Sequence, residues 1–462
     1  MKRNFKPLFF LLNALFITSL CLGQDKGKVV TNWLKQNSIT IKSIEAGSGF
    51  SDLQPLKKIL KDVQVIGLGE ATHGTHEFFK FKQRLVEFLV TQMGFTAFAM
   101  EASFSDCEPI NDYILTGKGD RAAVLTNQNY TAWDTEEFSA MLDWMRAYNQ
   151  KVPDEKKLRF YGLDILSLQK VGREKARLYF QKYLPEKLAS LDSVINIFKG
   201  QEANWLSRMN QTALQQSFIP LNDLINYLTD HKDRLIGASS LKEWDQTLKH
   251  LEIMQQSVYS NIDSLPPSFA SNKLERDEYM WQNMKYIMER ERPNTKFIVW
   301  AYNGHISTAD NGLKSTADRE KAFASLGYYL GQHLKEKYYA LGLECYEGTC
   351  QTREILPDDR WGDLKIDTLH TDLKTINWQF AQIGKPYLLV DLRQAWTNAI
   401  VSKWLDTPSS FAAAYWVHRA AKENFETRAP KGYCDGVFFI QRSTPVHPTK
   451  NASARSKGRI GF

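Results

Sequence analysis

Seven short apolar runs recur along this 462-residue chain, separated by stretches with helical spacing. They are VQVIGLGE (63–70), FTAFAMEA (95–102), LRFYGLDIL (158–166), KFIVWAYNGHI (296–306), YYALGLEC (338–345), YLLVDL (387–392) and GVFFIQ (436–441). Most are apolar throughout, which is the pattern of strands buried on both faces. Strands of this kind, separated by helices, predict an α/β fold with a mainly parallel central sheet flanked by helices.

A long segment without strand-like runs interrupts this pattern between residues 167 and 293. Apolar residues recur there at three- and four-residue intervals, as in Leu241, Trp244, Leu248, Leu251, Met254 and Val258. This spacing predicts amphipathic helices. We expect a helical insertion over 167–293 that forms a second lobe, and it would separate two parts of one catalytic domain, 24–166 and 294–442.

Both ends of the chain differ from the body. Residues 1–23 set Lys2, Arg3 and Lys6 before an apolar stretch that ends in Cys21-Leu22-Gly23, which predicts a signal peptide. The protein would then be exported, periplasmic or secreted, with no stable membrane insertion after cleavage; an uncleaved anchor is the alternative. Residues 443–462 are rich in Ser, Pro, Gly and Lys, which predicts a disordered basic tail.

The formal net charge of +7 comes from these two ends, so the body is close to neutral. A neutral body argues against a nucleic-acid partner, which needs clustered Lys and Arg. Four cysteines follow the leader: Cys107, Cys345, Cys350 and Cys434. An oxidising compartment would permit a disulfide between Cys345 and Cys350, but such sparse cysteines predict no disulfide framework.

The densest polar stretch, GLGEATHGTHEFF (67–79), follows the first apolar run and opens a helical stretch. It is therefore a strand-to-helix turn, whose Thr72, Gly74 or Thr75 would suit a helix cap. Gly67 and Gly69 do not predict a dinucleotide site, because the third glycine of that fingerprint is replaced by Thr72. No cofactor is predicted.

Several of the predicted strands end in a polar side chain. Glu70, Glu101, Asp164 and His305 occupy these positions in four different runs. Because ligands bind beyond the carboxyl ends of parallel strands, we expect these residues to converge there.

The residue types indicate a histidine general base. His73 lies three residues after Glu70, so a tight turn can pair them, and a carboxylate would fix the tautomer of the imidazole. Lys82, Arg84 and His305 are candidates for the cation that stabilises an oxyanion. No GxSxG motif is present, which favours direct attack by water.

Two alternatives stay open at this point. Glu70, His73, Glu101 and His305 could form the ligand shell of a metallohydrolase, although the local string HxxHE does not match the zinc signatures HExxH and HxxEH, and no metal is predicted. The 12 tryptophans and 19 tyrosines are also compatible with a carbohydrate-binding or polysaccharide-assembly protein.

The chain resembles the erythromycin esterase family from about residue 40 to 442. The resemblance lies in GLGEATHGTHEFFKFKQRLVEFLVTQMGFTAFAMEA (67–102), WDTEEFSAMLDWMRAYN (133–149), FYGLDI (160–165), LERDEYMWQN (274–283), IVWAYNGHIS (298–307), LGYYLGQ (326–332) and YCDGVFFI (433–440). It implies hydrolysis of an ester, such as a macrolactone, by water that an essential histidine activates. The partner would be a small-molecule ester or lactone, and the oligomeric state is not predicted.

The resemblance also implies roles for individual residues. His73 would be the essential histidine, with Glu70 and Glu101 as the family glutamates and His305 as a further catalytic residue. Lys82 and Tyr302 depart from the pattern, since some relatives carry arginine at the first position and many carry histidine at the second. These two are expected to contact substrate, and the remaining candidates for substrate contact are His76, Arg84, Trp133 and Asp164.

Overall fold

A computed structural model of the chain describes residues 27–128, 130–165, 169–197, 210–265, 274–309, 324–357, 361–369, 376–412, 416–418 and 425–457. The signal peptide predicted over 1–23 lies outside these residues. None of the helices in the described part of the chain is both long and apolar enough to cross a membrane.

The strands are β1 (Ser38–Thr40), β2 (Val65–Leu68), β3 (Ala97–Ser103), β4 (Arg159–Asp164), β5 (Phe297–Trp300), β6 (Tyr338–Ile355), β7 (Trp361–Leu369), β8 (Tyr387–Asp391), β9 (Ser409–Ala412), β10 (Phe425–Arg428) and β11 (Gly436–Ser443). After a first helix over residues 27–37, the main helices are α2 (Leu56–Ile59), α3 (His76–Met93), α4 (Glu108–Thr116), α5 (Arg121–Asn127), α6 (Glu136–Asn149), α7 (Lys170–Tyr183), α8 (Pro185–Ile197), α9 (Gln211–Asp230), α10 (Lys232–Ala238), α11 (Leu241–Asn261), α12 (Arg276–Arg290), α13 (Asn303–Ile306), α14 (Leu326–Leu334), α15 (Ile376–Ala381), α16 (Ala399–Leu405) and α17 (Lys450–Lys457).

The central sheet has the strand order β1-β8-β11-β6-β2-β5-β3-β4, with β7 paired to β6. The strands from β11 to β4 in this order are parallel to one another, whereas β8, β1 and β7 add antiparallel pairs. Each of the seven apolar runs contains one strand of this sheet. The predicted α/β fold with a mainly parallel, helix-flanked sheet is therefore confirmed.

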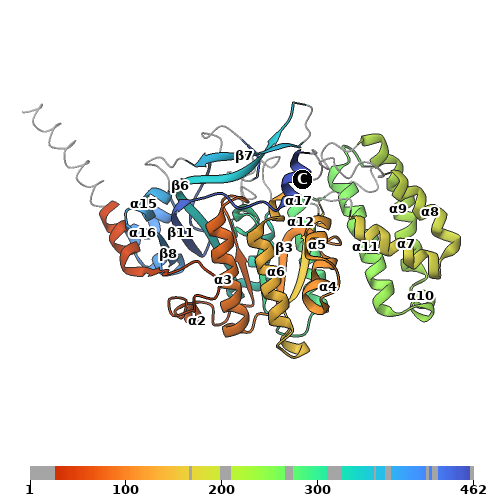
Figure 1. The fold of residues 1–462 in the computed structure, drawn as a ribbon, viewed down its shortest axis with the longest axis horizontal. Coiled ribbons are helices and arrows are strands. Elements are labelled where there is room, and N and C mark those ends of the chain that lie inside the picture. The colour runs from red at the N-terminus through yellow and green to blue at the C-terminus, as the bar shows by residue number, and fades with distance from the viewer. Residues whose placement is uncertain are drawn as a thin grey trace, which may run out of the picture.

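Both faces of the sheet are covered by helices. Alternate residues of each strand point to opposite sides, so each strand contributes to two cores. On β2, Ile66 and Leu68 join one core with the apolar face of α3, while Val65 joins a second core. That second core includes residues of α12, α14, α15 and α16. Figure 1 shows α3 and α6 side by side on the near face of the sheet.

The helices α7 to α11 form a lobe at one end of the molecule, beyond α4 (Figure 1). They share an apolar core of their own, which includes Phe180, Leu221 and Leu251. The helix α12 falls within the predicted insertion but packs Met280 and Met284 into the core under the sheet. The second lobe is thus confirmed, and its last helix belongs to the sheet.

Four strands were not predicted from the sequence. The strand β7 alternates buried and exposed residues, and its pairing with the second half of β6 makes a two-stranded extension of the sheet. The others, β1, β9 and β10, are three or four residues long. Short strands of this kind carry too little apolar periodicity to be read from sequence.

The prediction of a disordered tail over 443–462 is wrong for residues 443–457. Ser443 closes β11, and residues 444–457, which we call the C-terminal strap, pass over the start of α3 and α6 and end in α17. Thr449 and Arg455 both bind the buried carboxylate of Asp134, at 2.6 Å each. These polar contacts, together with the buried side chains of Val446 and Ala452, order this segment, which composition alone does not reveal.

The disulfide that the sequence permits between Cys345 and Cys350 is not present, and both residues are buried free thiols in β6. Five residues of extended strand separate them by roughly 16 Å, well beyond the span of a disulfide.

Candidate active site

The turn after β2 is held by its neighbours on both sides. The Ala71 amide donates to the Leu343 carbonyl of β6, and the Asn303 amide donates to the Glu70 carbonyl. Gly69 is required here because a Cβ would lie 2.0 Å from Asn303 Oδ1. The glycines of this stretch thus serve close packing, which fits the absence of a dinucleotide fingerprint.

Glu70 is fully buried and orients His73. His73 Nδ1 lies 2.6 Å from Glu70 Oε1, and the other oxygen of Glu70 accepts hydrogen bonds from Lys82 Nζ at 2.7 Å and Trp300 Nε1 at 3.0 Å. With the carboxylate ionised, Nδ1 carries the proton and Nε2 is left as the basic nitrogen. His73 remains 13% exposed, so this dyad can reach solvent.

Lys82 sits beneath this dyad with no exposed surface. Its ammonium group lies 4.0 Å from the centre of the Trp300 ring. Burial lowers the pKa of Lys82 to about 8, although Glu70 and Glu101 oppose the shift. Because it is buried, Lys82 fixes Glu70 and does not face substrate, which differs from its predicted role.

Arg276, at the start of α12, connects two of the predicted carboxylates. Its Nε donates to Asp164 Oδ1 at 3.0 Å, and its Nη2 donates to Asp164 Oδ2 and to Glu101 Oε1, the latter at 2.8 Å. The sequence analysis missed this residue, although it lies in the quoted string LERDEYMWQN. Its only signal was an arginine beside aspartate at the end of a helical insertion.

His305, in α13 after β5, completes this second cluster. Its Nδ1 lies 2.8 Å from Asp277 Oδ1, and its Nε2 lies 3.2 Å from Glu101 Oε1. Burial alone would lower the pKa of His305, but Asp277 and Glu101 outweigh it and raise the pKa to about 10. The two carboxylates therefore favour the protonated ring, whose Nε2 also lies 3.1 Å from Arg276 Nη1. Asp277 is a second residue that sequence reasoning missed.

The cations of this cluster are more exposed to solvent than its carboxylates. The side chains of Arg276 and His305 are 25% and 16% exposed, whereas Glu101 is 5% exposed and Asp164 fully buried. Burial opposes ionisation of Glu101, but His305 and Arg276 outweigh it and hold its pKa well below the usual range. Positive charge is thus presented to whatever enters, with the carboxylates behind it.

Two buried aromatic residues pack against the histidines of these clusters. The Tyr302 ring lies 6.0 Å from that of His73 and 6.2 Å from that of His305, between centroids. The Trp133 ring meets His73 edge-on at 4.9 Å, and its Nε1 donates to the Glu101 carbonyl. Tyr302 thus lies beside both histidines and Trp133 beside His73, and their predicted contact with substrate stays a prediction.

Two other predicted residues lie outside this arrangement. Arg84 is buried against Asp52 and the carbonyls of Ser43 and Gly49. It lies two positions after Lys82, which turns it by about 200° around the helix, so one of the pair must face away. His76 points to Glu137 at 2.6 Å and not to the dyad. Both expectations of substrate contact are thus corrected by the geometry.

The four side chains proposed as metal ligands do not form a single ligand shell. Glu70 pairs with His73, and Glu101 with His305, in two clusters separated by Tyr302. Among the described residues, the group of His, Cys, Asp or Glu side chains whose ligand atoms gather within 4.8 Å is a different one, His76, Glu137 and His447.

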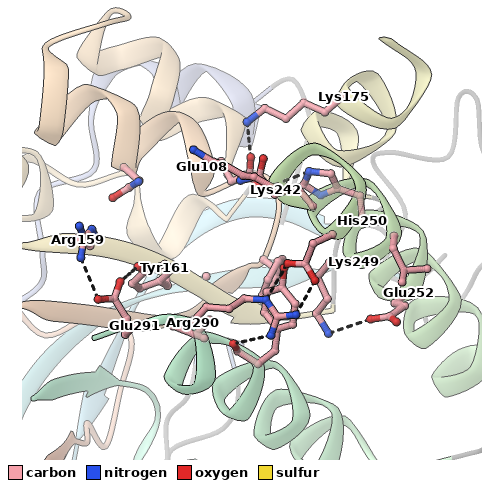
Figure 2. Close-up of a pocket in the computed structure, with 18 of the residues that line it drawn as sticks. Glu108, Arg159, Tyr161, Lys175, Lys242, Lys249, His250, Glu252, Arg290 and Glu291 are labelled. Carbon is pink, nitrogen blue, oxygen red and sulfur yellow. Dashed lines mark hydrogen bonds and ion pairs between the residues drawn. The ribbon is translucent and has the colours of Figure 1, made fainter. Parts of the chain in front are cut away.

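A cavity of about 1170 Å³ lies elsewhere, between α4, α11, α12 and the first residues of β4 (Figure 2). Its charged side chains pair with one another, as Arg159 does with Glu291 and Lys175 with Glu108. It meets the start of β4, whereas the two clusters lie beyond the end of that strand, at Asp164. The cavity is therefore separate from the candidate site.

The arrangement suits addition of water to a carbonyl group. A neutral histidine with a fixed tautomer can accept a proton from water. A guanidinium and an imidazolium on the other side of Tyr302 can stabilise the negative charge of a tetrahedral intermediate. The carboxyl edge of the sheet thus brings together a histidine with a fixed tautomer and two basic side chains, groups of the kinds that this chemistry needs.

Comparison with known proteins identifies relatives of this chain. A family model described as erythromycin esterase matches residues 90–443. A putative hydrolase, YbfO of Bacillus subtilis (strain 168), is 24% identical over 435 residues, which cover 90% of this chain and 91% of that protein. Erythromycin esterase type II of Escherichia coli is 26% identical over 348 residues, covering 71% and 79%.

Three solved structures share the fold. A Bacillus cereus protein superposes with a TM-score of 0.77 at 25% identity, covering 92% of this chain and 99% of that one. A succinoglycan biosynthesis protein gives 0.72 at 25% identity, covering 91% and 98%. An erythromycin esterase, an EreC mutant in its open conformation, gives 0.64 at 14% identity, covering 86% and 95%.

Proposed function

The chain belongs to the erythromycin esterase family, and we propose that it hydrolyses a carboxylic ester or lactone with water activated by His73. The observation that carries the proposal is the His73 and Glu70 dyad, which shares the Tyr302 ring as a neighbour with His305 and so lies near the cations of the second cluster.

The reaction needs one water molecule and the ester. His73 Nε2 takes a proton as the water oxygen attacks the carbonyl carbon, and Glu70 stabilises the imidazolium that forms. Arg276 and His305 stabilise the oxyanion. When the intermediate collapses, the carbon to alkoxide bond breaks and the alkoxide takes the proton from His73. The products are an acid and an alcohol, and His73 is neutral again.

Macrolactones are the first substrates to test, because one relative is named an erythromycin esterase. We propose mass-spectrometric turnover of macrolides, simple esters and lactones by the wild type, by His73→Ala and by His418→Ala. His418 is a matched control, since it is also a histidine paired with a carboxylate, that of Asp367. We expect His73→Ala to lower the rate by about 10²- to 10⁴-fold and His418→Ala to leave it unchanged.

The same panel separates the alternatives. Turnover that disappears with a chelator and returns with a metal would overturn water attack by the dyad alone. Absence of turnover on every ester would favour a non-catalytic role in polysaccharide assembly, in line with the name of the succinoglycan biosynthesis relative.

We further propose that the protein works outside the cytoplasm, on the basis of the basic and apolar order of residues 1–23. The mass of the protein recovered from cell fractions tests this. A chain that begins near Gln24 in the extracytoplasmic fraction is expected, and an intact Met1 chain in the cytosol would contradict it.

A further inference from the structure

Three side chains of types that can bind a metal ion converge outside the His73 and Glu70 dyad, at the start of the same helix. His76 Nδ1 lies 2.6 Å from Glu137 Oε1, and His447 Nδ1 lies 2.7 Å from the same oxygen. The ligand atoms of all three residues lie within 4.8 Å of one another. They come from the start of α3, the first turn of α6 and the C-terminal strap.

The backbone holds these residues in place. The His76 amide donates to the Thr444 carbonyl at 2.9 Å, and the Glu136 amide donates to the His447 carbonyl at 2.8 Å. The His447 amide in turn donates to the Glu137 carboxylate at 3.1 Å. The donors therefore meet because three segments are paired along their main chains, and not because long surface side chains happen to touch.

One side chain of the site is buried and the other two are exposed to solvent. Glu137 is buried, with 4% of its side chain exposed, whereas His76 is 24% and His447 69% exposed. The two imidazole rings meet edge-on, 5.2 Å apart between centroids. A ligand on the open side can thus be reached from solvent.

We propose that His76, Glu137 and His447 bind a divalent transition-metal ion of the zinc type. Two imidazole nitrogens and one carboxylate oxygen are a donor set that such ions favour, and the fourth position is left for water. Tetrahedral zinc would place its donor atoms about 3.3 Å apart, so each histidine nitrogen must move about 0.6–0.7 Å away from the Glu137 oxygen. The exposed His447 has room for that shift.

The ion would fasten the C-terminal strap to both helices. The strap also donates from the Val446 amide to the Gly74 carbonyl at 3.0 Å, one residue from His73. Binding should therefore stabilise the fold through the strap. This inference does not depend on the proposed esterase activity, because neither His73 nor Arg276 takes part.

Cobalt(II) titration of the tag-free full chain tests the site by its visible absorption. The wild type should bind one ion with the intense bands of a four-coordinate centre, and the bands should disappear or need at least about tenfold more cobalt in His447→Ala. His447→Ala is the decisive variant because an exposed side chain can be removed without unfolding. The described cysteines are buried, so thiolate does not compete.

His418→Ala is the matched control and should bind cobalt like the wild type. Zinc should raise the melting temperature of the wild type and of His418→Ala but not of His447→Ala. Cobalt that gives only the weak bands of the hydrated ion, or that binds His447→Ala as well as the wild type, would overturn the proposal.

Discussion

Lys82 and Glu70 form an ion pair with no solvent-exposed surface, in which the ammonium nitrogen lies 2.7 Å from Oε2. The other oxygen of Glu70 holds His73. The charge of Lys82 is therefore coupled to the base through one carboxylate, and the state of a residue that never meets substrate should control the rate.

The pH dependence of the rate should reveal this coupling. Burial lowers the pKa of Lys82 from 10.5 to about 8, so the folded protein loses this charge as pH rises through 8. Turnover should then decline with an alkaline limb near pH 8. Lys82→Arg keeps its charge there, and its profile should stay flat to higher pH. An alkaline limb that is the same in both proteins would show that another group causes it.

His305 should make stability depend on pH in a defined window. Its pKa is raised from 6.5 to about 10, so between these values the folded chain holds a proton that the unfolded chain lacks. This contribution is complete below pH 6.5 and is lost as pH rises to 10, with a total of at most a few kcal/mol. Urea unfolding of the wild type and His305→Gln across this range measures it. A wild type that loses no more stability than the variant would contradict the assignment.

Two substitutions of Arg276 should affect turnover and stability differently. Arg276→Lys keeps one charge near Asp164 and Glu101 but loses the fork that bridges them, and we expect roughly a 10²-fold lower kcat in a folded protein. Arg276→Ala leaves the buried carboxylate of Asp164 without its cation and should cost about 3–5 kcal/mol of unfolding free energy.

Arg290→Lys is the control for Arg276, because Arg290 ends the same helix and also binds an aspartate, Asp245. That pair is partly exposed, and its loss should cost at most about 1 kcal/mol. If Arg276→Lys and Arg290→Lys change kcat and the unfolding free energy equally, Arg276 has no special role in catalysis.

Gly74 should not tolerate a side chain. A Cβ at this position would lie 1.9 Å from the Gln351 carbonyl oxygen, so Gly74→Ala must push β6 away from the turn that carries His73. Turnover and melting temperature should both fall. Gly237→Ala is the matched control, since nothing lies within 4 Å of a Cβ there and alanine should stabilise that helix by about 0.5–1 kcal/mol.

Two truncations of the C-terminal strap should show separately how it affects stability and turnover. A stop after Thr449 removes α17 and the bond from Arg455 to Asp134, which should lower the melting temperature but leave the turn intact. A stop after Ser443 also removes the bond from Val446 to Gly74 and should abolish turnover. Full activity of the shorter chain would show that the turn is self-sufficient.

The sequence predicted the fold and the dyad where the local pattern of residues has a single structural explanation. Apolar runs marked the buried strands, because a strand covered on both faces has no polar positions. His73 and Glu70 could be paired because three residues of turn must bring them close.

The misses share a physical cause, which is contact between segments distant in the chain. Arg276 lies 112 positions from Asp164, and nothing local indicates that the two meet. Lys82 and Arg84 could not be ranked until the helix face was known. The strap was read as disordered because its order comes from the carboxylates of Asp134 and Glu137, which only the fold supplies.

The place of β2 in the sheet sets a sequence of events for the growing chain. This strand, which leads into Glu70 and His73, lies between β5 and β6, so both of its neighbours are made more than two hundred residues after it. The lobe of α7 to α11 is synthesised in between and has its own core. The central strand must therefore wait, exposed to water, while later parts of the chain emerge, and such long-range pairing is slow. We expect the chain to depend on protection from aggregation during that interval. The turn that carries His73 should need this protection for longest, because the C-terminal strap that covers it is made last.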